Sequence, residues 1–64
     1  MKFTLEISMD NAAFENREGG EVNRILEVLR QEIFREFPSL LPGTTINLRD
    51  INGNKVGLAE VRED

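Results

Sequence analysis

One change in the spacing of apolar residues constrains the fold of this 64-residue chain more than any other feature. Phe3, Leu5, Ile7 and Met9 alternate with polar residues, which places them on one face of a strand. From position 21 the apolar residues recur every three or four positions, as they do along one stripe of a helix. The pattern predicts a first strand and then a helix. The expected helix stripe comprises Val22, Ile25, Leu26, Leu29, Ile33 and Phe37.

The predicted helix runs from about Glu21 to about Glu36, because Pro38 disfavours helical geometry at the residue before it. Between strand and helix, Asp10-Asn11 favours a turn or a helix cap, and residues 12–14 can form one helical turn. Phe14 would then close one end of the core. Gly19-Gly20 is expected to interrupt the chain before the helix.

The second half of the chain predicts two more strands. After the Pro42-Gly43 turn signal, Ile46 and Leu48 alternate with polar residues, and a third strand runs from Lys55 to about Arg62. In the third strand we expect the small row, Gly57, Ala59 and Val61, beneath the helix, since the opposite orientation would bury Glu60. Val56 and Leu58 would remain partly exposed.

These elements predict a single α+β domain over residues 1–64 with the order β-α-β-β. The expected sheet has three strands, is mostly antiparallel and carries the one main helix on one face. A right-handed crossover makes the first two strands parallel in direction, so placing the third strand between them makes every neighbouring pair antiparallel. A chain this short buries only about 60% of the surface that it exposes when unfolded.

The stretch D-I-N-G-N-K-V-G at positions 50–57 raises the question of a metal site, because Asp50, Asn52 and Asn54 carry oxygen atoms at alternate positions. A calcium loop of the EF-hand kind needs glycine where Lys55 stands and glutamate where Val61 stands, so no metal site is predicted. Asn52-Gly53 instead favours a two-residue type I′ hairpin turn. Ile51 and Asn54 would flank that turn, and Gly57 would mark a bulge.

The residue inventory favours a protein without enzymatic activity or a cofactor. The chain has no His, Cys or Tyr, and its few hydroxyl groups have no activating base nearby in the sequence. Its net charge of −4 and a predicted sheet face without aromatic rings disfavour nucleic-acid binding. Nor does any stretch approach the roughly 20 apolar residues that span a membrane. A cytoplasmic location is the default expectation.

Three groups of residues are candidate protein-contact surfaces, each with a plainer explanation. The acidic group can be explained by helix-start electrostatics, the sheet-face group by ordinary solvation, and the apolar group by scattered exposure. The acidic group is Asp10, Glu15, Glu18 and Glu21; the open sheet face offers Glu6, Arg49 and Leu58; the apolar group is Phe34, Leu40 and Leu41.

The sequence resembles a group of short uncharacterised proteins of bacteriophages, prophages and mobile elements. The resemblance rests on N-A-A-F at 11–14, E-V-x-R-I-L at 21–26 and D-x-N-G-N-x-V-G at 50–57, and it spans nearly the whole chain. Where that group often has an aromatic residue after the hairpin, this chain has Ala59. Small acidic phage proteins often act by binding host proteins, including complexes of CRISPR immunity.

We therefore expect a small non-enzymatic protein-binding module of phage or prophage type, an anti-CRISPR-like inhibitor of a host defence complex being the specific form of that expectation. The partner would be a host protein or complex, including one that handles nucleic acid, with no direct contact to nucleic acid or membrane. The alternative is a structural or self-associating accessory protein that uses the apolar group. The expected state is a monomer or a weak homodimer.

Overall fold

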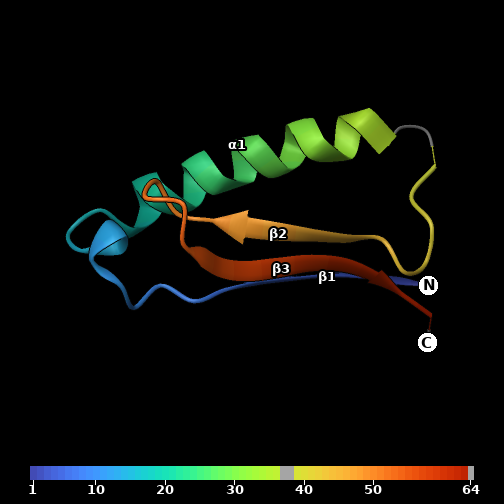
Figure 1. Cartoon of the computed structure of the whole chain (residues 1–64), viewed down its shortest axis with the longest axis horizontal. Helices are drawn as coiled ribbons and strands as arrows, with labels where there is room; N and C mark the ends of the chain where they lie inside the picture. The colour runs from blue at the N-terminus through green and yellow to red at the C-terminus, as the bar shows by residue number, and fades with distance from the viewer. Residues whose placement is uncertain (37–38, 64) are drawn as a thin grey trace.

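A computed structural model describes residues 1–36 and 39–63 and confirms the α+β class (Figure 1). Its described elements follow the predicted order, with a short 3-10 helix, η1, between the first strand and the main helix. No helix in the described ranges is long and apolar enough to cross a membrane. The elements are β1 (Lys2–Ile7), η1 (Ala12–Phe14), α1 (Glu18–Glu36), β2 (Thr45–Arg49) and β3 (Lys55–Arg62).

The sheet has the strand order β1-β3-β2, with both neighbouring pairs antiparallel. Ala59, at the centre of β3, lies opposite Leu5 of β1 and Ile46 of β2, so these three side chains share one face. Ala59 is fully buried and Val61 almost so. The small row of β3 therefore lies on the core side of the sheet, as the cost of burying Glu60 predicted.

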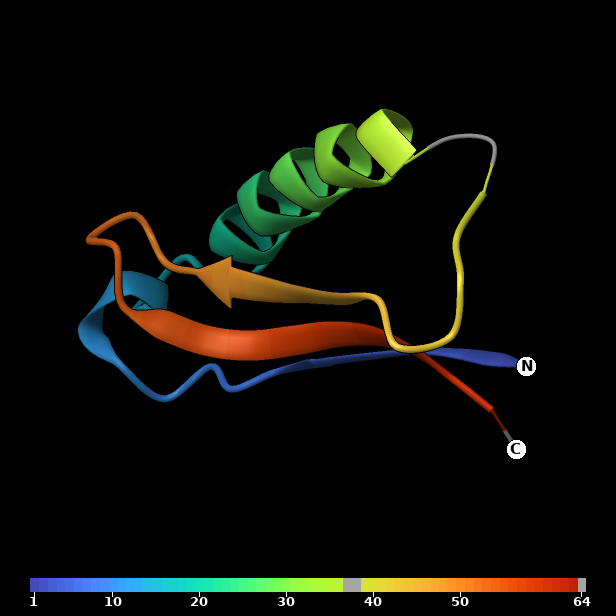
Figure 2. The same ribbon diagram turned by 45° about the vertical axis from the view of Figure 1, so that its right-hand side comes forward.

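The main helix packs over one side of the sheet rather than over its middle. Ile25 and Leu29 of α1 are buried in one cluster with Leu48 of β2 and Phe14 of η1. In both views α1 lies nearest to β2, and its C-terminal end diverges from the strands (Figures 1 and 2). Strand β1 lies on the far side of β3. The core is consequently formed mainly by α1, η1, β2 and the centre of β3.

The helix begins earlier than the sequence indicated. It starts at Glu18 and includes Gly19 and Gly20, so the expected interruption by this glycine pair is wrong. Glycine is least costly in the first turn, where the N–H groups have no partner inside the helix. The end of the helix at Glu36 agrees with the prediction, whereas Phe37 of the expected stripe lies outside the described residues.

The predicted type I′ turn is also wrong. The Asp50 N–H donates to the Asn54 carbonyl at 2.9 Å, and the Gly53 N–H donates to the Asp50 carbonyl at 3.0 Å. Residues 51–53 thus form a three-residue hairpin loop in which Gly53 has a φ of +86°. Asn16 is the only described non-glycine residue with positive φ, so Asn52 does not have the backbone that a type I′ turn requires.

A β-bulge follows the hairpin, as the sequence suggested. Leu48 pairs with Gly57 and Arg49 with Lys55, which leaves Val56 as the extra residue. Val56 is half-buried, in agreement with its predicted partial exposure, but it packs against the core and not on the opposite face of the sheet. The bulge explains this difference because it breaks the strict alternation of faces at that residue.

Candidate protein-contact surfaces

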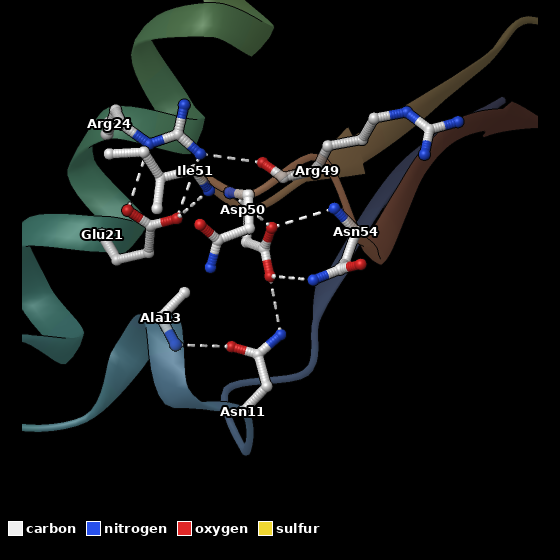
Figure 3. Close-up of polar contacts among 9 residues, drawn as sticks. Asn11, Ala13, Glu21, Arg24, Arg49, Asp50, Ile51 and Asn54 are labelled. Atoms are coloured by element: carbon white, nitrogen blue, oxygen red, sulfur yellow. Dashed lines mark hydrogen bonds and ion pairs between the residues drawn. The ribbon is translucent and has the colours of Figure 1, made fainter.

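The suspected metal stretch is a hydrogen-bonded turn built around one carboxylate. Asp50 is only 4% exposed, and one of its oxygens, Oδ1, accepts the backbone N–H groups of Asn52 and Asn54, each at 2.9 Å. Its second oxygen accepts the side-chain amides of Asn54 at 3.2 Å and of Asn11 at 2.8 Å (Figure 3). Both carboxylate oxygens are therefore engaged by N–H donors.

Asn11 connects this turn to the other end of the chain. Its side-chain oxygen accepts the Ala13 N–H at 2.9 Å and so caps η1, while its amide nitrogen donates to Asp50 (Figure 3). One side chain thus fixes the 3-10 helix and joins it to a loop 39 residues away in sequence. The sequence predicted the cap but gave no sign of the second contact.

A second carboxylate fastens the helix to the same hairpin. Glu21 is 6% exposed and accepts both the Nε and an Nη of Arg24, at 3.1 and 3.0 Å. It also accepts the Ile51 N–H at 2.9 Å, while Arg24 donates to the Arg49 carbonyl at 2.9 Å (Figure 3). The first turn of α1 is held to the hairpin by charge-assisted hydrogen bonds, which are stronger than neutral ones.

Both buried carboxyl groups are held in the ionised form. For Asp50, burial opposes ionisation, but the bonds from Asn54, Asn11 and Asn52 outweigh it, so the net effect lowers its pKa. For Glu21, the hydrogen bond from Arg24 lowers the pKa against the opposing effect of burial. Among residues 1–36 and 39–63, no three His, Cys, Asp or Glu side chains gather in a way that could hold a metal ion.

The structure divides the predicted acidic group. Asp10, Glu15 and Glu18 are exposed around η1 and the start of α1, and the Ser8 hydroxyl donates to Asp10 at 3.3 Å. Glu21 does not belong with them as a contact residue, because it is buried against Arg24 and the hairpin. We refer below to Asp10, Glu15 and Glu18 as the acidic cluster.

The three residues predicted on the open sheet face differ in their exposure. Glu6 is exposed and lies opposite the half-buried Leu58 on the neighbouring strand. Arg49 is exposed, but its guanidinium donates to the Gly53 carbonyl at 3.1 Å and so supports the hairpin. Glu6 and Arg49 therefore place exposed charges on the two outer strands, and the Arg49 charge also has a structural role.

The predicted apolar group is only partly exposed. Phe34, near the C-terminal end of α1, and Leu41, in the connection to β2, are both exposed, whereas Leu40 is half-buried. The end of α1 and the segment leading to β2 lie at the same end of the molecule as the chain termini (Figure 1). These residues therefore occupy the end opposite to the hairpin.

Three further exposed apolar residues were missed, because the apolar patterns of the first strand and of the helix assigned them to the core. Phe3 and Leu5 lie on the helix side of β1, yet they remain 44% and 42% exposed. Leu26, which belongs to the predicted stripe of α1, is 40% exposed. We call these three residues the β1 strip.

The position of the helix accounts for this exposure. One flank of α1, carrying Arg24, Val28 and Glu32, lines a groove of about 390 Å³ together with β2. Leu26 is two positions from both Arg24 and Val28, so it projects from the opposite flank. Because the helix lies nearest to β2, its other flank and the apolar side of β1 are left uncovered (Figure 2). Hydrophobic periodicity alone cannot reveal such a lateral displacement.

Comparison of the chain with protein-family models, with curated proteins and with solved structures finds no match.

Proposed function

We propose that this chain is a small non-enzymatic protein-binding module that acts by contact with a host protein or protein complex. The observation that carries the proposal is the β1 strip. Phe3, Leu5 and Leu26 are each at least 40% exposed although they lie on the sides of strand and helix that normally form a core. Exposed apolar groups with polar neighbours are typical of protein-interaction sites.

The charge of the chain supports a partner with a basic rim around an apolar contact. The net charge is −4, and the exposed acidic cluster follows directly on the end of β1. Complementary charge accelerates the encounter of two proteins, while apolar burial supplies most of the affinity. Such a partner presents apolar side chains toward the β1 strip and Lys or Arg toward the acidic cluster.

Inhibition of a host defence complex is the specific form of the proposal. It rests on the resemblance to short phage and prophage proteins, and complexes that handle nucleic acid carry basic surfaces of the required sign. The partner would be met in the cytoplasm. A role without catalysis is supported by Glu21 and Asp50, which are the buried carboxylates among the described side chains, because both are committed to hydrogen bonds within the fold.

A pair of serine variants on opposite flanks of α1 tests the contact surface. Leu26→Ser removes an apolar side chain of the β1 strip, and Val28→Ser removes one of similar exposure, 49%, on the flank facing β2. We expect tagged wild-type chain to capture a partner from a bacterial lysate, Leu26→Ser to lose most of it, and Val28→Ser to retain it. Equal recovery by the two variants would reject the strip.

The acidic cluster and the inhibitory role need separate measurements. Reversal of Asp10, Glu15 and Glu18 to Lys should slow association with the captured partner and reduce its dependence on salt. If the chain inhibits a defence complex, its expression should protect an incoming plasmid or phage from that complex, and Leu26→Ser should abolish protection. Capture without protection would retain the binding module and exclude the inhibitor.

A further inference from the structure

Strand β1 has an unpaired outer edge with regularly oriented hydrogen-bonding groups. It is the first strand in the order β1-β3-β2, so within residues 1–36 and 39–63 its one strand partner is β3 (Figure 1). The Ser8 N–H donates to the Val56 carbonyl at 2.8 Å, and this contact continues the register in which Glu6 faces Leu58 and Thr4 faces Glu60. Even-numbered residues of β1 therefore bond to β3.

The odd-numbered residues of β1 consequently direct their N–H and C=O groups away from the sheet. Within the strand these are Phe3, Leu5 and Ile7. The outer edge of β1 is also accessible, because α1 lies near β2, which forms the other edge of the sheet (Figure 2). The β2 edge differs, since the Arg24 side chain of α1 already donates to the Arg49 carbonyl there. An unpaired strand edge of this kind is a template for another strand.

We propose that β1 pairs with β1 of a second copy, antiparallel and around a two-fold axis at Thr4, which joins the two sheets into one of six strands. Phe3 of each copy then faces Leu5 of the other, and both residues direct backbone groups outward, so the required hydrogen bonds can form. Thr4 of one copy faces Thr4 of the other on the face of the sheet that is turned away from the helix. Interfaces with this symmetry use the same patch on both subunits.

Charge complementarity selects this register. With the axis at Thr4, Lys2 of each copy lies directly opposite Glu6 of the other, so the dimer gains two opposite-charge pairs. An axis at Phe3 would place Lys2 opposite Thr4, and an axis at Leu5 would place it opposite Ser8. Within one chain neither charge has an oppositely charged residue facing it, because Lys2 faces Arg62 and Glu6 faces Leu58.

The dimer does not rest on the proposed function. Pairing uses the backbone edge of β1, whereas the side chains of Phe3 and Leu5 stay on the helix side of the joined sheet. Two copies of the β1 strip would then lie side by side. Failure of either proposal leaves the other intact, because Leu26→Ser affects the strip and the charge variants described next affect the edge.

A charge exchange tests the register in solution. Glu6→Lys places like charges opposite each other twice in the dimer, and so does Lys2→Glu; each should raise the dimer dissociation constant roughly 3- to 30-fold. The double variant Lys2→Glu with Glu6→Lys should restore the wild-type value. Glu27→Lys, an equal change in net charge at an exposed site on α1, should have little effect. Sedimentation equilibrium over a wide concentration range measures all five proteins.

Amide hydrogen exchange locates the interface independently. As the wild-type concentration rises, the N–H groups of Phe3 and Leu5 should become protected, whereas those of Thr4 and Glu6 should be protected throughout. A 7.3 kDa species at every concentration would overturn the proposal, as would a dimer without restoration by the double variant. Protection that appears only when a different protein is added would assign the edge to that protein and also overturn it.

Discussion

Two residues of the β2–β3 hairpin, Asp50 and Gly53, have distinct structural roles. Asp50 organises its own loop through the Asn52 and Asn54 N–H groups and reaches η1 through Asn11. Gly53 supplies the left-handed backbone that closes the loop. These contacts explain why residues 50–54, which carry side-chain oxygen atoms at alternate positions, form a structural turn. Its carboxylate is oriented into the protein and satisfied there.

Gly57 is required for a reason unrelated to turn conformation. A Cβ atom at this position would overlap the backbone carbonyl oxygen of Glu6 on β1, which cannot move without disturbing the strand. We expect Gly57→Ala to lower the free energy of unfolding by about 1–3 kcal/mol, as overpacking does. Urea titration followed by circular dichroism measures the change. Unaltered stability would show that β1 and β3 can separate locally at little cost.

At the scale of elements, the first turn of α1 contains two residues that weaken it. Gly19 and Gly20 have ordinary helical positions with no atom near the place of an added Cβ, so packing gives no reason for glycine there. The helix start is secured instead by Glu21, whose carboxylate bonds Arg24 and the hairpin. Tertiary contacts therefore compensate for poor helix propensity.

Gly20→Ala should accordingly stabilise the protein. Alanine loses less conformational freedom in a helix; the gain is about 0.5–1 kcal/mol in a helix interior and is smaller in the first turn, where Gly20 lies. For a domain of this size, 1 kcal/mol raises the melting temperature by about 4–8 °C. Thermal unfolding of Gly20→Ala and of Gly57→Ala compares the same substitution at two sites. One site has open space around the new Cβ atom, and the other is crowded. A lower melting temperature for Gly20→Ala would indicate that the glycine pair serves a contact outside the described fold.

At the scale of the whole molecule, the polar network joins the elements at the hairpin end, where Phe14 of the core also lies. Glu21 and Asp50 join α1, the β2–β3 hairpin and η1, and Phe14 of η1 is buried in the core. The other end, where α1 diverges from the sheet, leaves apolar groups exposed (Figure 2). The hairpin end of the molecule is thus held together by hydrogen bonds, whereas the exposed apolar side chains elsewhere remain available for association.

The pH dependence of stability should report on this network. The pKa values of Glu21 and Asp50 are lowered from their ordinary values of 4.5 and 3.8. The unfolded state therefore binds protons more readily, and the stabilisation is complete above about pH 4.5 and is lost as the pH falls through the lowered pKa values. We expect a constant urea midpoint between pH 7 and pH 5 and a decline below that range.

Two amide variants separate this effect from the titration of exposed carboxylates. Glu21→Gln and Asp50→Asn should each reduce stability at neutral pH and make its acid dependence shallower, because the uncharged group no longer gains protons. Glu15→Gln, which removes an exposed carboxylate and leaves Glu21 and Asp50 in place, is the matched control. Parallel profiles for all four proteins would show that the buried carboxylates do not contribute to acid unfolding.

Apolar spacing and local chemistry were sufficient to predict the elements, their order and the faces of the strands, except at the bulged residue Val56. The spacing of apolar residues predicted the strand that contains Phe3 and Leu5 and the helix that contains Ile25 and Leu29. The spacing is informative because the period of each element follows from its backbone geometry. The small row around Ala59 was assigned to the core face because the alternative buries a charge. Local chemistry also predicted the cap at Asn11.

The lateral position of the helix, the type of the hairpin loop and the role of Glu21 instead depend on contacts between residues far apart in the sequence. Glu21 resembled any acidic residue at a helix start until Arg24 and the Ile51 N–H were brought to it. Phe3 and Leu5 showed a core pattern but are left uncovered, because periodicity specifies which face is apolar and not how far a neighbouring helix extends over it. The surfaces proposed for association arise from that displacement of α1 toward β2.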